Sequence, residues 1–237
     1  MAGMGSARMG MVWAAVQEAI TDEHAQIVDI GGGTGGFAVP LAELGHRVLV
    51  VDPNPDALAA LARRAAEAGV THLVTAHQGD VGDVSDLAKD LDTDVDLVLC
   101  HEVLEVLDDP AAGLDTIVSI LRPGGTLSLV VAGRHAAVVA RAMAGHFQQA
   151  RALLDDSSHQ GQVRRFTPDE IMAMLAEAGL VPDAIHAARV FTDLVPGALV
   201  DSEPGAAQAL LELEQAVFDR PEYLALATHL HVLAHPA

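Results

Sequence analysis

The chain has 237 residues, and its 33 acidic against 13 basic side chains give a formal net charge of −20. This length suits one domain, while the charge disfavours general binding to phosphate backbones without excluding a local basic patch. The lone cysteine, Cys100, excludes a disulfide framework and a cysteine metal site, and no apolar run reaches the roughly 20 residues of a membrane span. We therefore expect a cytoplasmic protein without a metal ion or a membrane association.

The first ten residues are rich in glycine and methionine, and Arg8 is their only charged residue. From Met11 to Thr21 apolar residues recur at helical spacing, which predicts a helix that leads into the first strand. Arg8 would then lie near the loop after that strand, where its guanidinium can pair with a carboxylate. The alternative is a solvated arginine near a frayed terminus.

A strand, a glycine turn and a helix then follow in close succession. Residues 31–36 read Gly-Gly-Gly-Thr-Gly-Gly between an apolar strand over 26–30 and a helix-forming stretch over 37–44. Glycine adopts backbone angles closed to other residues and lets a ligand approach the bare main chain, and the start of the following helix can receive a polar or anionic group. The spacing of the first, third and sixth positions matches the G-x-G-x-x-G pattern of a dinucleotide site.

Acidic residues flank this turn on both sides. Asp52 ends the next strand at the distance that the dinucleotide pattern requires, and a carboxylate there can accept both hydroxyls of a ribose. Pro53 stops that strand before a helix over 57–68, which we expect Asp56 to cap. Asp29 lies two residues before the first glycine, where a dinucleotide-binding strand is usually apolar; it can bind an ammonium group or fix the loop.

The third and fourth strands bring further polar groups to the same edge. In the loop Gly79-Asp80-Val81, the carboxylate can accept the exocyclic amine of adenine and the amide of Val81 can reach a ring nitrogen; the alternative is an ordinary turn. His101 follows the buried fourth strand, at the carboxyl end where open α/β sheets bind their ligands. It is a candidate contact to cofactor or substrate and a candidate general base, with a packed histidine as the alternative.

The rest of the chain completes an α/β pattern. The segment from Gly133 to Gln162 indicates helices inserted after the fifth strand, where they would cover the pocket as a lid. Thr167 and Glu170 form a capping box with Pro168 at the first helical position, and this helix closes at Gly179. Strands are expected over residues 26–30, 47–51, 72–76, 95–100, 126–132, 185–191 and 225–233, and helices over 11–21, 37–44, 57–68, 111–121, 168–178 and 206–218.

In this order, the landmarks resemble the class I S-adenosylmethionine-dependent methyltransferases. Within that class the chain is similar to the bacterial SmtA-like group, which includes the tRNA 5-carboxymethoxyuridine methyltransferases. The resemblance depends on Arg8 with Trp13, residues 31–33, Asp52, and residues 101–105, 121–125, 143–147, 189–191 and 210–214.

The resemblance implies a Rossmann-like fold. Its seven-stranded, mostly parallel sheet would have an antiparallel last strand, helices on both faces and a helical insertion after the fifth strand. We expect a single domain, with an N-terminal helix or lid over 1–25, a cofactor-binding core over 26–132, the insertion over 133–162, and the C-terminal part of the sheet over 163–237.

The implied cofactor is S-adenosylmethionine, and the expected site has a cofactor side and a substrate side. Cofactor contacts are expected from Arg8, Asp29, Gly31, Gly32, Gly33, Asp52, Pro53, Gly79, Asp80, Val81 and His101. Substrate contacts are expected from Arg164, Arg165 and Arg189.

The expected reaction is in-line methyl transfer to oxygen, with a carboxylate on a modified wobble uridine of tRNA as the acceptor that the resemblance implies. An ionised carboxylate needs no base, whereas a hydroxyl would use His101. The chain departs from the tRNA enzymes at residues 152–156, where it lacks their lysine-rich stretch. A small-molecule O- or N-methyltransferase, a non-catalytic cofactor-binding protein and a nicotinamide dehydrogenase are the alternatives, and no obligate protein partner is evident.

Overall fold

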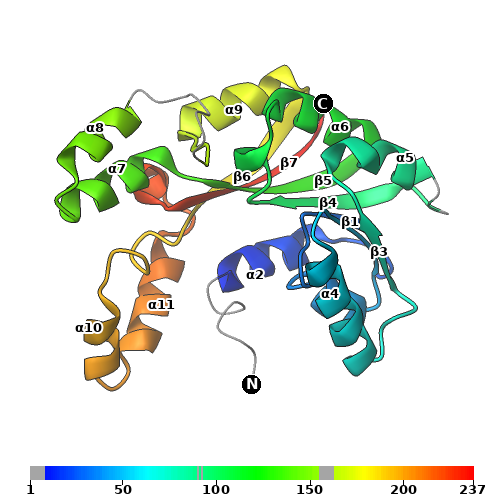
Figure 1. Ribbon diagram of the computed structural model, residues 1–237, viewed down its shortest axis with the longest axis horizontal. Coiled ribbons are helices and arrows are strands. Elements are labelled where there is room, and N and C mark those ends of the chain that lie inside the picture. Colours follow the sequence, from blue (N-terminus) through cyan, green and yellow to red (C-terminus); the bar gives the residue numbers. More distant parts are fainter. Residues whose placement is uncertain (1–8, 90, 92, 155–162) are drawn as a thin grey trace.

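The computed structural model describes residues 9–89, 91, 93–154 and 163–237. Its centre is a seven-stranded sheet with the strand order β3-β2-β1-β4-β5-β7-β6 (Figure 1). The strands are β1 Gln26–Ile30, β2 Arg47–Asp52, β3 Val74–Gln78, β4 Val95–His101, β5 Leu121–Ala132, β6 Leu180–Ala188 and β7 His229–Pro236. Strands β1 to β5 pair in parallel, and β7 runs antiparallel to both β5 and β6. The Rossmann-like sheet with an antiparallel last strand is therefore confirmed.

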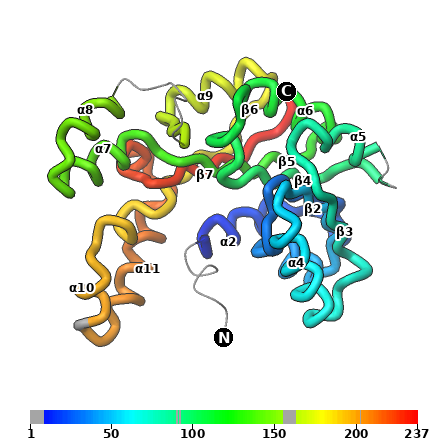
Figure 2. Tube along the Cα trace, viewed as in Figure 1, coloured from blue at the N-terminus to red at the C-terminus, as the bar shows by residue number. Residues whose placement is uncertain are grey.

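Helices cover both faces of this sheet, as Figures 1 and 2 show. The α-helices are α2 Gly10–Ala19, α3 Ala38–Glu43, α4 Pro55–Glu67, α5 Val84–Lys89, α6 Pro110–Ile120, α7 Arg134–Met143, α8 Phe147–Leu154, α9 Pro168–Glu177, α10 Gly197–Ser202 and α11 Ala206–Val217, and the 3-10 helices are η1 Val81–Asp83, η2 Leu104–Val106 and η3 Pro221–Leu226. Side chains of α6 and α9 pack into one buried apolar cluster, and those of α2, α3 and α4 pack into another. Burial on two faces explains why the central strands read as continuous apolar runs.

Local sequence signals account for several element boundaries. Thr167 and Glu170 form the predicted capping box, with hydrogen bonds of 3.2 and 2.8 Å between the backbone and the two side chains. The predicted cap at Asp56 is wrong: the side chain of Asn54 accepts from the amides of Asp56 and Ala57 instead, because the helix begins at Pro55.

Strand boundaries were predicted less well. Strand β3 begins two residues later than expected, and β6 covers 180–188 instead of 185–191. Strand β5 includes the Pro-Gly-Gly turn, because Leu121 already pairs with Val95 across an irregularity in the register. Helices α5 and α10 were not expected. Among the described residues, no helix has the length and apolar character that crossing a bilayer requires.

Candidate functional site

The strand order places the predicted cofactor residues at one edge of the sheet. Strand β1 lies between β2 and β4, so the chain first builds outward through β2 and β3 and then continues on the other side with β4. Such a reversal opens a crevice at the carboxyl ends of the two strands beside it. The glycine loop follows β1, Asp52 ends β2, Asp80 follows β3 and His101 ends β4. The structure therefore brings these predicted residues to a common edge.

The glycine loop has the unusual backbone that its sequence predicts. Gly31 and Gly33 have φ angles of 69° and 54°, which disfavour residues with a Cβ atom. The amide of Gly31 donates to the carbonyl of Val51 at 2.7 Å, which ties the loop to β2. A Cβ atom on Gly33 would find its nearest neighbours, Oδ2 of Asp52 and the carbonyl oxygen of Gly31, 3.9 Å away, which is ordinary van der Waals contact.

The carboxylate of Asp29 packs against Gly32 of the glycine loop. Its side chain is only 4% exposed, and its Oδ2 would lie 2.5 Å from a Cβ atom added to Gly32. Burial, and secondly the charge of Asp52, raise the pKa of Asp29 to about 7. Of the two roles proposed for Asp29, this position favours fixing the loop.

Asp52 joins the glycine loop to the end of β2. Its Oδ2 accepts the amide of Gly33 at 2.9 Å and its Oδ1 accepts the amide of Asn54 at 2.8 Å. A carboxylate has about four acceptor positions, so these two bonds fix the side chain and leave capacity for ribose hydroxyls. The carbonyl of Pro53 accepts from the side chain of Gln78 at 3.3 Å.

The loop after β3 is also held in place. The amide of Gly79 donates to the carbonyl of Asp52 at 3.3 Å. Asp80 caps η1, because its Oδ1 accepts the amide of Gly82 at 2.8 Å while its own amide donates to Asp83 at 2.9 Å. Val81 is the first residue of η1. The exposed carboxylate of Asp80 and the start of η1 thus lie beside Asp52, as an adenine contact requires.

His101 lies at the end of β4, against the helix that follows the glycine loop. Its ring meets Phe37 edge-on, with ring centroids 4.7 Å apart, and its Nε2 lies 2.8 Å from Oγ of Ser128. Burial lowers the pKa of His101 to about 4. A general base works best with a pKa near the working pH, so this environment does not favour the predicted role as base. A neutral hydrogen-bonding role suits it better.

The predicted arginines have different surroundings. Arg8 lies outside the described residues. Arg189 has a φ angle of 58° and forms an ion pair of 2.6 Å with Asp193. Arg164 donates its amide to the carbonyl of Glu105 at 3.1 Å. Only Arg165 lines a cavity near the crevice.

That cavity has a volume of about 290 Å³ and lies where β5 ends and β7 begins. Helix α7 forms one wall of it. The lining residues are Ala132, Gly133, Ala137, Ala140, Arg141, Arg165, Thr228 and His229. Arg141 and Arg165 are the charged members and none of the eight is acidic, so this cavity favours an anionic group. We refer to it below as the acceptor cavity.

Sequence reasoning missed a hydrogen bond that connects the acceptor cavity to the end of β4. Oε1 of Glu102 lies 3.0 Å from Nε2 of His229, and this hydrogen bond lowers the pKa of Glu102. Among the described residues, Glu102 and Arg189 are the only non-glycine residues with positive φ. Such backbone strain persists where the surrounding structure enforces it, commonly at functional sites. Only the position of Glu102 directly after His101 could have indicated its role.

A buried glutamate holds the segment that carries Arg189. Glu214 of α11 is 1% exposed, and its carboxylate accepts the amides of Val190, Phe191 and Thr192 at 2.9, 2.9 and 2.7 Å. Two stretches on which the resemblance depended, residues 189–191 and 210–214, therefore contact each other. This explains why both occur together in the sequence.

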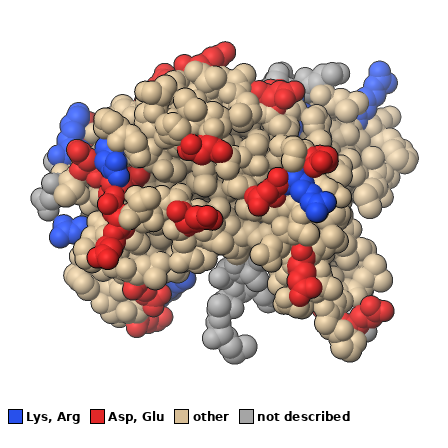
Figure 3. Space-filling model, turned by 180° about the vertical axis from the view of Figure 1, so that it is seen from behind, with Lys and Arg blue, Asp and Glu red and all other residues tan. Residues whose placement is uncertain are grey.

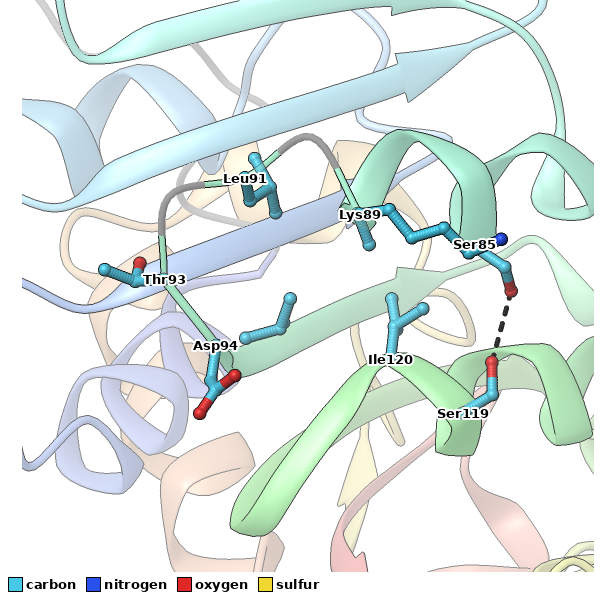
Figure 4. A pocket seen from close by; sticks show the side chains of 9 residues that line it. Ser85, Lys89, Leu91, Thr93, Asp94, Ser119 and Ile120 are labelled. Carbon is cyan, nitrogen blue, oxygen red and sulfur yellow. Dashed lines mark hydrogen bonds between the residues drawn. The ribbon is translucent and has the colours of Figure 1, made fainter.

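A larger cavity of about 490 Å³ lies at the opposite end of the sheet (Figure 4). It is lined from α5, the start of β4 and the end of α6, where the hydroxyls of Ser85 and Ser119 are 3.1 Å apart. The length of β4, roughly 20 Å, separates it from the glycine loop, so we do not assign it to the site. Within the described residues, no group of three or more His, Cys, Asp or Glu side chains is placed to hold a metal ion.

Comparison with known proteins identifies the class of protein to which this fold belongs. A family model described as a methyltransferase domain matches residues 28–127. Solved structures with the same fold include geranyl diphosphate C-methyltransferase from Streptomyces coelicolor, with a TM-score of 0.62, 16% identity, and coverage of 96% of this chain and 79% of that one. The [4+2]-cyclase SpnF has a TM-score of 0.61, 18% identity, and coverage of 95% and 80%. At such identities these likenesses show the fold alone.

Sequence relatives show the family. One relative is 31% identical over 97% of this chain and 88% of its own length. The chain therefore belongs to the class I methyltransferases, enzymes that take their methyl group from S-adenosylmethionine. That relative is the tRNA 5-carboxymethoxyuridine methyltransferase of Escherichia coli K12. The ubiquinone biosynthesis O-methyltransferase of Xanthomonas euvesicatoria is 34% identical over 66% of this chain and 62% of its own length.

The crevice fits this cofactor. The main chain at Gly33 lies beside the carboxylate of Asp52, which accepts its amide at 2.9 Å; Asp52 ends β2, and Asp80 comes two residues after the neighbouring strand β3. A ribose and an adenine are adjacent in the cofactor, so the two acidic residues suit them in that order. The alternatives of a nicotinamide dehydrogenase and of a non-catalytic binding protein are set aside by the family membership.

Proposed function

We propose that this enzyme methylates an oxygen of a carboxylate carried by a modified wobble uridine of tRNA. The observation that carries the proposal is the acceptor cavity, which offers two arginines and no acidic residue in a chain whose net charge is −20. Acidic side chains are spread over the face shown in Figure 3, so a cavity free of them is a local exception. A carboxylate acceptor suits such a lining.

The segment beside the cavity also suits a nucleic acid. Residues 133–154 contain Arg134, Arg141 and Arg151 and no Asp or Glu. Phe147 and Met143 are 71% and 68% exposed on the same segment. Proteins that bind unpaired nucleotides combine basic groups with exposed aromatic side chains on which bases stack. Arg134 is buried and pairs with Glu170 at 2.8 Å, so the exposed Arg141 and Arg151 supply the local positive charge that the overall charge does not exclude.

The chain would act mainly by positioning its ligands. When bound, S-adenosylmethionine supplies an activated methyl group. Asp52 would hold the ribose, Asp80 and Val81 the adenine, and Arg165 with Arg141 the acceptor carboxylate. An ionised carboxylate is a nucleophile without a base, which agrees with a pKa of about 4 for His101. Orientation and exclusion of water would then supply most of the rate enhancement.

The test is methyl transfer from labelled S-adenosylmethionine to tRNA with and without 5-carboxymethoxyuridine. We expect label only in the carboxylate-bearing tRNA. Arg165→Gln and Arg141→Gln should each raise the KM for that tRNA about tenfold, since a charged hydrogen bond is worth roughly 1.5–3 kcal/mol, and should leave the affinity for S-adenosylhomocysteine unchanged. Arg63→Gln, at an exposed position of α4, is the control and should change neither.

Salt dependence separates this proposal from a small-molecule acceptor. The negative surface favours a small acceptor as the second candidate, and one relative is a ubiquinone biosynthesis O-methyltransferase. For tRNA, kcat/KM should fall steeply between 50 and 200 mM salt, with a log–log slope that grows by about one for each phosphate contact. A flat salt response with methylation of a phenolic acceptor would support the second candidate and contradict the first.

A further inference from the structure

A row of polar side chains crosses one face of the sheet beneath the cofactor crevice. Four neighbouring strands contribute one residue each: His101 from β4, Ser128 from β5, His231 from β7 and His186 from β6. Oγ of Ser128 lies 2.8 Å from Nε2 of His101 and 3.0 Å from Nε2 of His231. The ring of His231 stacks on that of His186, with centroids 5.1 Å apart.

This row is costly to bury. Ser128 and His231 are both fully buried, on a face whose other buried residues are largely apolar. Each buried polar group that lacks a partner costs roughly 1–3 kcal/mol, and an apolar pair would avoid that cost. Nδ1 of His101 and Nδ1 of His231 have no hydrogen-bond partner among the described residues. This cost indicates a functional role for the row.

The hydroxyl of Ser128 links the tautomers of the two histidines. A hydroxyl has one hydrogen to donate, so with neutral rings it donates to one Nε2 and accepts from the Nε2–H of the other. In the first arrangement His101 carries its hydrogen on Nε2 and His231 on Nδ1. In the second, His231 carries it on Nε2 and His101 on Nδ1.

The two arrangements differ in where they leave an unpaired N–H. The first leaves it on Nδ1 of His231, which is fully buried, and orphaned buried N–H groups are rare. The second leaves it on Nδ1 of His101, an atom that is also buried and unpartnered, but in a residue that is partly exposed at the carboxyl end of β4, where the carboxylate of a ligand that enters the crevice can accept it. Burial lowers the pKa of both rings, so both are neutral in either arrangement.

The order of the strands indicates which part of the cofactor meets His101. Asp80 comes after β3 and the glycine loop after β1, whereas Asp52 ends β2 and His101 ends β4. If adenine lies by β3 and ribose by β2, the amino-acid end of the cofactor reaches β4. The carboxylate of that end accepts hydrogen bonds, whereas its ammonium group only donates them.

We propose that Ser128 and His231 are positioning residues, which fix His101 in the Nδ1–H tautomer so that it donates to the carboxylate of the bound cofactor. His231 donates from Nε2 to Ser128, and Ser128 donates to Nε2 of His101. The proposal depends on the placement of His101 at the cofactor, which is tested separately below.

The direct test is nitrogen-15 NMR of the histidine rings in the complex with S-adenosylhomocysteine, with His101 and His231 assigned through His101→Gln and His231→Phe. We expect Nδ1–H for His101 and Nε2–H for His231. The reverse pair of tautomers would overturn the proposal. Ser128→Ala should leave His101 as a mixture of tautomers, which a purely structural role of the hydroxyl would not predict.

Binding measurements provide a second test. Ser128→Ala and His231→Phe should weaken binding of S-adenosylhomocysteine about fivefold to tenfold, and His231→Gln, whose amide can donate from the same place, should restore it. Binding of 5′-methylthioadenosine, which lacks the amino-acid end, should stay unchanged in all three variants. His186→Phe keeps the stacking but never contacts Ser128, so it is the control and should bind both ligands normally.

The outcomes separate two assumptions: that His101 contacts the cofactor, and that Ser128 and His231 set the tautomer of His101. If His101→Gln leaves the affinity for S-adenosylhomocysteine unchanged, His101 does not contact the cofactor and the placement itself is wrong. If His101→Gln weakens binding while Ser128→Ala and His231→Phe do not, the placement holds and the proposed relay is wrong. Equal losses for S-adenosylhomocysteine and 5′-methylthioadenosine would also contradict the relay, because they would indicate a general disturbance of the crevice.

Discussion

The amide of Gly33 donates to Oδ2 of Asp52 at 2.9 Å, so the proposed ribose ligand also holds the glycine loop in place. Asp52→Ala removes both roles. We expect the affinity for S-adenosylhomocysteine, measured by calorimetric titration, to fall by about 1–3 kcal/mol. Asp52→Asn should lose less of this affinity, because the side-chain carbonyl oxygen of the asparagine can still accept from one amide.

Asp56→Ala is the matched control for this change. Asp56 lies in the first turn of the helix that follows Asp52 and its side chain is exposed. Its removal should leave cofactor affinity within experimental error. If Asp52→Ala binds S-adenosylhomocysteine with unchanged affinity, Asp52 does not hold the ribose, whatever the control shows.

Gly32 and Gly36 provide a second pair of variants within one loop. A Cβ atom on Gly32 would lie 2.5 Å from the carboxylate of Asp29 and 2.9 Å from a methyl group of Val50, whereas one on Gly36 would meet nothing within 4 Å. Overpacking typically costs about 1–3 kcal/mol, so Gly32→Ala should lower the free energy of unfolding by that amount. Gly36→Ala should be neutral in urea denaturation, and similar losses in both variants would contradict the close fit over Asp29.

The raised pKa of Asp29 makes the stability of the protein depend on pH. The folded protein holds this proton up to a pH of about 7, whereas the unfolded chain releases it near pH 4. Between these values the folded state binds more protons, so the free energy of unfolding falls as the pH rises and levels off above pH 7.

Asp29→Asn isolates that contribution. From pH 5 to pH 8 we expect the free energy of unfolding of the wild type to fall on the order of 2–3 kcal/mol more than that of the variant. Urea denaturation at each pH measures this difference. Asp94→Asn, at an exposed position, should follow the wild type. Parallel curves for the wild type and Asp29→Asn would show that Asp29 is ionised in the folded protein throughout this range.

Glu214 should be important for stability although it lies far from the glycine loop in the sequence. In Glu214→Gln, an NH₂ group would face backbone amides that also donate, and a charged acceptor for the amides of Val190, Phe191 and Thr192 would be lost. We expect the free energy of unfolding to fall by about 2–3 kcal/mol. Glu212→Gln, on the exposed side of the same helix, should change it by less than about 0.5 kcal/mol. Hydrogen exchange of the 190–192 amides should speed up only in the first variant.

The gathering of the expected cofactor residues at one edge of the sheet was predictable because its signals are local. The glycine loop follows β1, Asp52 and His101 end β2 and β4, and Asp80 comes two residues after β3; parallel strands end at one edge of a sheet. The capping box at Thr167 likewise depends on residues three positions apart. Such short-range patterns can be recognised in a single sequence.

The acceptor side depends on contacts that no short pattern reveals. His229 meets Glu102 across strands that are far apart in the chain, and nothing near His229 marks it as part of a site. The bond between Ser128 and His231 likewise forms only because β7 pairs with β5. Arg141 was seen as part of a helical lid but not as a cavity residue, because the face that a helix turns inward is decided by its packing.

The position of β7 between β5 and β6 has a consequence for synthesis of the protein. The strands β1 to β5 and their helices can assemble as soon as they leave the ribosome, whereas β6 has no neighbour in the sheet until β7 has been made. Until then β6 is an unpaired edge of the kind that invites aggregation. The last strand of the sequence therefore both joins β6 to the rest of the sheet and, through His229, completes the lining of the acceptor cavity.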